Sequence, residues 1–148
     1  MLAFCLSLGV MFVADYFIGR VSTFESAWYQ GLIKPPYSPH VIVYEIGYTL
    51  AFGTAVICCT LSTVKPNLRK TLAVWLGIAL LSVLCPITLF LWHSTYGALG
   101  ISAIIVAALG FLFHYYIKNT RELWLAVAPT IVWFAYLFVF YYGLSILN

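Results

Sequence analysis

Residues 98–117 read ALGISAIIVAALGFLFHYYI, a run of twenty residues without a single Asp, Glu, Lys or Arg. A helix needs about 20 mostly apolar residues to cross a bilayer, so this stretch predicts a membrane span. In the whole chain of 148 residues, 64% are hydrophobic and only 7% are charged. So few charged side chains cannot cover a soluble domain of this size, which excludes an ordinary cytosolic enzyme and a disordered chain. The net charge of +3 is too small and too scattered for a nucleic-acid surface.

Four further segments are long and apolar enough to span a membrane, and every Lys and Arg lies between segments. The runs are too long for transmembrane strands and lack their alternation. We therefore predict an all-α integral membrane protein, a single five-helix bundle over residues 1–148. Residues 1–19 lack a basic start and contain Asp15, which favours a span over a cleavable signal peptide. The four further spans are predicted at about residues 2–18, 41–61, 71–91 and 124–147.

The connection at residues 19–40 is much longer than the other three. A long connection in a compact protein is usually functional, and often a lid. Residues 34–39 read KPPYSP and are expected to be rigid, because proline fixes φ and restricts the residue before it. Five Lys and Arg residues fall on the Met1 side of the predicted spans and two on the loop side. The positive-inside rule then predicts a cytoplasmic N-terminus in a bacterial inner membrane, with the loop and Asn148 outside.

Few ionisable residues fall within the predicted spans. Asp15 and Glu45 are functional candidates by default, since intramembrane carboxylates are costly. Structural roles are favoured for both. Glu45 is expected in the first turn of its helix, where the dipole favours a carboxylate, and Asp15 could pair with Arg20.

The histidines and cysteines do not form a metal-binding pattern. His40 precedes the second predicted span and is the histidine placed to touch a ligand, whereas interfacial roles are favoured for His93 and His114. All four cysteines fall inside predicted spans without metal-ligand spacing, so they are interpreted as packing residues. We expect no metal and no cofactor.

The predicted helix at residues 41–61 carries two stripes with a four-residue period. One is made of small residues, interpreted as a packing face that lets helices approach closely: Gly47, Ala51, Ala55 and Cys59. The other is aromatic and is interpreted as a cavity wall, because phenols in hydrocarbon need partners: Tyr44, Tyr48 and Phe52.

Trp133 is the best single candidate for a ligand-stacking side chain. It lies in the middle of the last predicted span, away from both interfaces, where tryptophan is less expected. It follows Pro129 by four residues and therefore shares its helix face. Pro129, like Pro86 in the third span, removes a backbone hydrogen bond and can kink its helix.

Residues 28–35 read WYQGLIKP and match the pattern W-Y-x-x-L-x-K-P between a first and a second span. Residues 129–133 read PTIVW and match P-Y-x-x-W in the proline and the tryptophan. With about 150 residues and five spans, the chain resembles the translocator protein (TspO) family, also called peripheral-type benzodiazepine receptors. Tyr48 stands where that family has a tryptophan on its second helix.

The resemblance implies a five-helix bundle, usually a homodimer, with a pocket closed by the first loop. Family ligands are porphyrins and other tetrapyrroles, sterols in animal members, and planar aromatic drugs. The residues that match the family pocket by register, together with His40 and Tyr44 from the reasoning above, give this candidate ligand-binding set: Trp28, Pro39, His40, Tyr44, Tyr48, Phe52, Leu81, Trp133 and Leu137.

The function expected from the sequence is a membrane receptor or transporter-like protein that binds porphyrins and related planar hydrophobic ligands. Its other partners would be membrane lipid and possible sterols, but no nucleic acid. The alternative is an enzyme that degrades porphyrin oxidatively in light, against which the absence of the second tryptophan counts. A small multidrug exporter and a purely structural subunit are further alternatives. The first predicts a carboxylate deep in a span, and the second does not need the aromatic, proline-rich loop.

Overall fold

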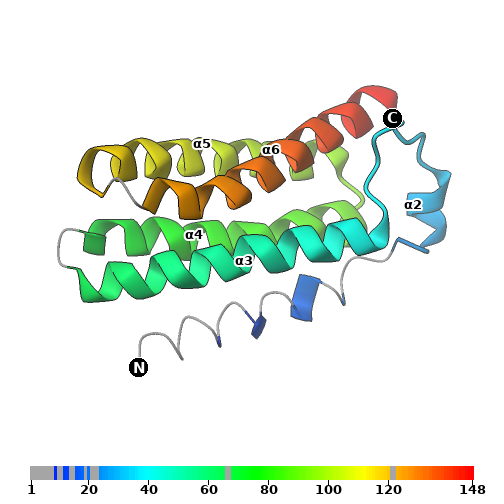
Figure 1. Cartoon of the computed structure of the whole chain (residues 1–148). Helices are drawn as coiled ribbons and strands as arrows, with labels where there is room; N and C mark the ends of the chain where they lie inside the picture. Colours follow the sequence, from blue (N-terminus) through cyan, green and yellow to red (C-terminus); the bar gives the residue numbers. More distant parts are fainter. Residues whose placement is uncertain are drawn as a thin grey trace.

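The computed structural model describes residues 24–65, 68–120 and 123–148, together with positions 9, 12, 13, 16–18 and 20. The described part contains four helices that are long and apolar enough to cross a membrane. They are α3 (Val41–Val64), α4 (Arg69–Pro86) with its continuation η2 (Ile87–Leu91), α5 (Thr95–Asn119) and α6 (Leu123–Leu147) (Figure 1). Each extends one to three residues beyond at least one predicted boundary, and the all-helical prediction is confirmed.

The first predicted span, residues 2–18, lies largely outside the described residues, and Asp15 with it. The structure therefore supports four spanning helices, and the fifth is not confirmed. Among the neighbouring described residues, Arg20 is exposed, and its Nε donates to the Tyr16 hydroxyl at 3.2 Å.

The four long helices form a ring in which α3 packs against α4 and α6, and α5 packs against α4 and α6. Figure 1 shows α3 and α4 in one layer and α5 and α6 in the other. Because short connections join consecutive helices, neighbours in the ring run antiparallel. The long loop and the end of α6 lie at one end of the bundle (Figure 1), and the ends of α3 and α5 lie at the other.

Apolar side chains cover the outside of the ring, and several hydroxyls are buried within it. Large hydrophobic residues on all four helices are at least half exposed, among them Leu50, Leu80, Ile104 and Val132. A soluble protein rarely exposes so large an apolar surface, whereas a lipid-facing surface requires it. The chain is therefore a multi-pass membrane protein. The side that each end of the bundle faces stays a prediction.

A chain of hydrogen bonds ties three helices together away from the loop. Trp75 Nε1 donates to the Tyr116 hydroxyl at 2.9 Å, and Tyr116 donates to Thr71 Oγ1 at 3.1 Å. Thr71 and Ser62 hydroxyls lie 2.8 Å apart, and Ser62 donates to the Cys58 carbonyl at 2.7 Å. All these side chains are buried, where hydrocarbon could not satisfy their hydrogen-bonding groups. The hydrogen bonds therefore join α4 to both α5 and α3.

Tyr116→Phe is expected to destabilise the protein by about 1–3 kcal/mol, because the buried Trp75 N–H loses its acceptor. Thermal unfolding in detergent measures the effect. Tyr96→Phe is the matched control, since Tyr96 lies on the same helix and is 70% exposed. Equal stability of the two variants would show that the Trp75 N–H finds another acceptor.

The structure bears on two sequence-based expectations about the helices, one at Glu45 and one at Pro86. Glu45 lies beyond the first turn of α3, so the dipole explanation for this exposed carboxylate is wrong. At Pro86, α4 ends and the chain continues directly into the π-helical turn η2, after which the Trp92 N–H bonds to the Ile87 carbonyl at 3.1 Å. Proline cannot donate to the preceding turn, and a local change of helical register absorbs that loss. His93 then ends the helix with a φ of 55°.

Candidate functional site

The loop at residues 24–40 is tied to the end of α6. The Ile33 N–H donates to Asn148 Oδ1 at 2.9 Å, and Asn148 Nδ2 donates to the Ile33 carbonyl at 3.0 Å. The Tyr136 hydroxyl donates to the Tyr37 carbonyl at 2.9 Å. These bonds join residues about one hundred positions apart in sequence and fix the loop across one end of the bundle.

A glycine on α6 makes this docking possible. A Cβ built on Gly143 would overlap the Tyr37 hydroxyl and lie 3.2 Å from the buried Pro35 ring. Because Gly143 has no side chain, the proline-rich segment lies close against the backbone of α6. The expected rigidity of this segment stays a prediction.

Gly143→Ala is expected to loosen the loop, because the added methyl group displaces Tyr37 and presses on Pro35. Amide hydrogen exchange at residues 33–38 should increase, with a stability loss of about 1 kcal/mol at most. Gly110→Ala is the control, because nothing lies within 4 Å of a Cβ added there. Unchanged exchange in the loop would mean that the tyrosine moves aside while the loop stays docked.

The first part of the loop forms a short helix, α2 (Ala27–Gly31), which the sequence-based interpretation did not anticipate. Ser26 caps it by accepting a hydrogen bond from the Tyr29 N–H at 3.3 Å. The Trp28 ring stacks on His93, with centroids 4.5 Å apart and an angle of 24° between the rings. Trp28 thus contacts the α4–α5 connection, and Figure 1 shows α2 beyond that end of the bundle.

Tyr29, which follows Trp28 in the loop, covers the loop end of the bundle. Tyr29 is buried, with its ring 5.2 Å from those of Phe24 and Phe90, and Phe24 lies 5.0 Å from Tyr44 of α3. Lys34 Nζ lies 4.7 Å from the Tyr29 ring centroid. Burial, with the neighbouring Tyr136 as a lesser cause, raises the pKa of Tyr29 to about 12. The Tyr29 phenol therefore stays protonated and uncharged at physiological pH.

Inside the bundle, next to Phe24 and Tyr29, the aromatic stripe of α3 meets Trp133 of α6. The Trp133 centroid lies 6.0 Å from that of Tyr44 and 5.8 Å from that of Tyr48, both edge to face. Tyr48 also lies 5.9 Å from Phe52 and 5.9 Å from Phe134. We call these five residues the aromatic cluster. Spacing along one helix predicted the stripe, and the structure brings Trp133 against it.

Two buried polar atoms of the aromatic cluster have no regular hydrogen bond within the described part of the chain. Among the described residues, the Tyr48 hydroxyl and the Trp133 indole N–H are buried and make no hydrogen bond of ordinary length and angle. The Tyr44 hydroxyl, in contrast, lies 3.4 Å from that of Tyr141. Buried polar groups without partners are uncommon and costly, so each needs an explanation. A ligand that supplies an acceptor would satisfy the indole N–H.

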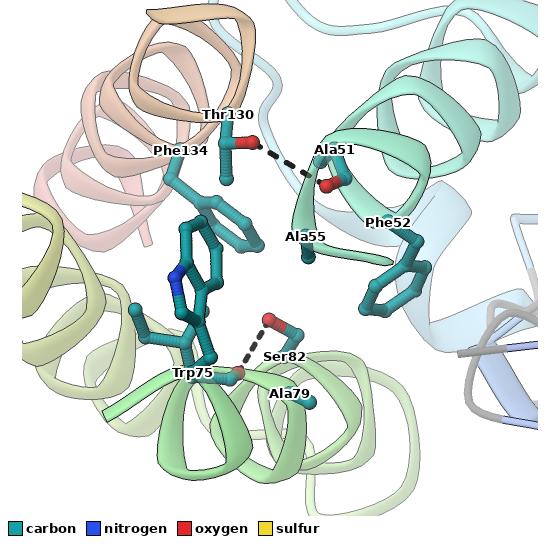
Figure 2. A pocket seen from close by; sticks show the side chains of 9 residues that line it. Ala51, Phe52, Ala55, Trp75, Ala79, Ser82, Thr130 and Phe134 are labelled. Atoms are coloured by element: carbon teal, nitrogen blue, oxygen red, sulfur yellow. Dashed lines mark hydrogen bonds between the residues drawn. The ribbon is translucent and has the colours of Figure 1, made fainter. Parts of the chain in front are cut away.

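The interior beside the cluster is closely packed. A gap of about 10 Å³ remains between α3, α4 and α6, enough for no more than one water molecule. Figure 2 shows Phe52, Trp75 and Phe134 surrounding this gap, while the Thr130 hydroxyl donates to the Ala51 carbonyl at 3.3 Å. A planar ligand does not fit there in this conformation.

A much larger space lies on the outer side of Trp133. It is a groove of about 760 Å³ between α3 and α6, within the usual size range of ligand sites. Two aromatic residues line it, and the remaining lining residues are apolar or glycine. Its lining residues are Val43, Gly47, Leu50, Leu125, Ala128, Pro129, Val132, Trp133 and Tyr136.

Gly47 explains why Trp133 lies where it does. A Cβ on Gly47 would overlap the benzo ring of the indole, so the missing side chain allows the ring to lie directly on α3. Gly47 and its small neighbours Ala51 and Ala55 are all buried, which confirms that the small-residue stripe of α3 is a packing face within the chain. The stripe allows α6 to approach α3.

The remaining candidate residues are scattered around this centre. Leu137 is fully buried one turn beyond Trp133 on α6, and Pro39 is buried just before α3. His40 is the N-terminal cap residue of α3 with an exposed side chain, and Leu81 is half-buried on α4. Among the described residues, no group of three His, Cys, Asp or Glu could hold a metal ion.

Two residues of this site were not identified as ligand contacts from the sequence. Tyr136 follows Trp133 by three positions, a helical spacing that places both on one face, and the rings lie 5.5 Å apart. Gly47 was assigned only to packing, because no sequence pattern shows that its partner across the interface is a tryptophan.

Comparison of the chain with protein-family models and with curated proteins finds no match.

Proposed function

We propose that the protein is a membrane-embedded binder of porphyrins and related planar hydrophobic ligands, as in the translocator protein family that its sequence resembles. The ligand would lie in the groove between α3 and α6 and contact Trp133 of the aromatic cluster and Tyr136. A fifth helix from the first predicted span would complete the bundle, and homodimer formation would follow the family pattern. The proposal treats the protein as a receptor or transporter rather than an enzyme.

The observation that carries this proposal is Trp133, which lines a ligand-sized groove and whose buried indole N–H has no hydrogen-bond partner among the described residues. The indole is 8% exposed, so water does not readily satisfy its N–H. Carboxylates, carbonyls and ring nitrogens of a tetrapyrrole are all acceptors. A bilayer offers no such acceptor at mid-depth, which makes an empty site costly.

The chemistry of the walls also supports a flat, apolar ligand. Trp133 and Tyr136 offer aromatic faces, and an apolar pocket with a few polar groups is the usual form of a small-molecule site. Lys34 lies on the loop at the same end of the bundle as Tyr136 and could attract a carboxylate arm. Its Nζ donates to Gln30 Oε1 at 3.1 Å on the exposed surface. Exposed polar contacts contribute little free energy, so a ligand carboxylate could replace Gln30 at little cost.

The test is tryptophan fluorescence quenching of the purified protein in nanodiscs by protoporphyrin, heme and a sterol in parallel. Saturable quenching by the two tetrapyrroles, above that of protein-free nanodiscs, is expected. Quenching by the sterol alone would change the ligand class to sterols. Linear, non-saturable quenching by all three would contradict the proposed function.

A further inference from the structure

The bundle end beneath the loop is closed by several independent contacts. Ile33 and Asn148 form two hydrogen bonds, Tyr136 binds the Tyr37 carbonyl, and Trp28 stacks on the α4–α5 connection. Opening this end would break all of them and expose the buried Tyr29 and Phe24. In this structure the loop is a plug rather than an open entrance.

The side of the bundle between α3 and α6 is open instead. Val43, Leu50, Leu125 and Val132 line the groove and are 49%, 59%, 61% and 69% exposed. In a multi-pass membrane protein, exposed apolar side chains on spanning helices face acyl chains rather than water. The groove therefore opens into the bilayer.

We infer that a planar apolar ligand dissolved in the bilayer enters laterally through the groove between α3 and α6, while the loop stays docked. This inference rests on the proposed function and specifies the access route to the same site. The ligand moves sideways from the hydrocarbon region into the groove and reaches Trp133 there.

Trp133 forms the partition between the groove and the aromatic cluster. It lines the groove on one side, and on the other it contacts Tyr44 and Tyr48, which are buried and do not line the groove. Gly47 holds this partition against α3, since any larger residue there would displace the indole. A ligand in the groove therefore reaches the indole without any change in the loop.

A planar ligand suits this groove better than an acyl chain or a second copy of the protein. An acyl chain has no aromatic face to stack on Trp133 or Tyr136 and no atom that could accept a hydrogen bond from the Trp133 N–H, which has no partner among the described residues. A second copy would have to fill about 760 Å³ with protruding side chains. A flat macrocycle supplies an aromatic face, acceptor atoms and the volume together.

The test separates the two routes with two variants. Ala128→Trp fills the groove, because Ala128 lines it. Ala107→Trp, exposed on α5, is the matched control for adding an indole to the lipid-facing surface. A disulfide between Ile33→Cys and Asn148→Cys locks the loop at residues that do not line the groove. Protoporphyrin is added in liposomes, and its association rate with each protein in nanodiscs is measured by stopped-flow quenching.

Lateral entry predicts at least tenfold slower association for Ala128→Trp, and rates within twofold of the natural protein for both the control and the oxidised, locked protein. Normal association by Ala128→Trp, or loss of association on oxidation that reduction restores, would overturn the inference while leaving the proposed function intact. A change in oligomeric state with Ala128→Trp at unchanged association rate would overturn it in favour of a second copy in the groove. Absence of binding by the natural protein would overturn the proposed function and this inference with it.

Discussion

Trp133→Ala is expected to weaken protoporphyrin binding tenfold or more. Stacking of a flat base on an aromatic side chain is worth about 1–3 kcal/mol in other systems, and about 1.4 kcal/mol corresponds to one decade in affinity. The variant also removes the indole N–H, which has no partner among the described residues and would donate to the proposed ligand. Trp133→Phe should have an intermediate affinity, since it keeps an aromatic face but loses the N–H. Titration of porphyrin absorbance in nanodiscs measures all three affinities.

Trp92→Ala is the control for the loss of a tryptophan elsewhere, because Trp92 is 67% exposed and does not line the groove. Its porphyrin affinity should match that of the natural protein. Equal affinities for Trp133→Ala and the natural protein, both folded by circular dichroism, would remove Trp133 from the site. Tyr48→Trp, which places on α3 the tryptophan found there in the family that the sequence resembles, should bind at least as tightly if Tyr48 belongs to the ligand site.

Gly47→Ala is expected to lower both stability and porphyrin affinity. The added methyl group overlaps the Trp133 indole, and overpacking of a close interface usually costs about 1–3 kcal/mol. The indole must move away from α3, toward the groove or toward Tyr44, and either position changes the ligand surface. Thermal unfolding in detergent and porphyrin titration of the folded protein measure the two effects.

Gly53→Ala on the same helix provides the matched control. Nothing lies within 4 Å of a Cβ added at Gly53, so alanine there should be neutral or slightly stabilising. If Gly47→Ala were as stable as this control and bound porphyrin normally, α6 could shift freely, and Gly47 would not position Trp133.

Helix number and type within the described part followed from composition and run length. Hydrocarbon cannot satisfy backbone hydrogen-bonding groups, so long uncharged runs must form helices whatever their neighbours are. This is why α3, α4, α5 and α6 lie within a few residues of their predicted boundaries. The four-residue spacing of Tyr44, Tyr48 and Phe52 likewise determined that their side chains share one face.

The sequence could not show what those faces meet. Whether Tyr48 borders a cavity or a packed interior depends on how closely α6 approaches α3, and that depends on the fit of Trp133 onto Gly47. The loop is a docked plug because Gly143 admits Pro35 and Tyr37, a contact more than one hundred residues apart in sequence. Local periodicity determines which residues share a helix face, because it depends only on backbone geometry. The groove depends on the steric fit between side chains of different helices, and only the tertiary structure decides that fit.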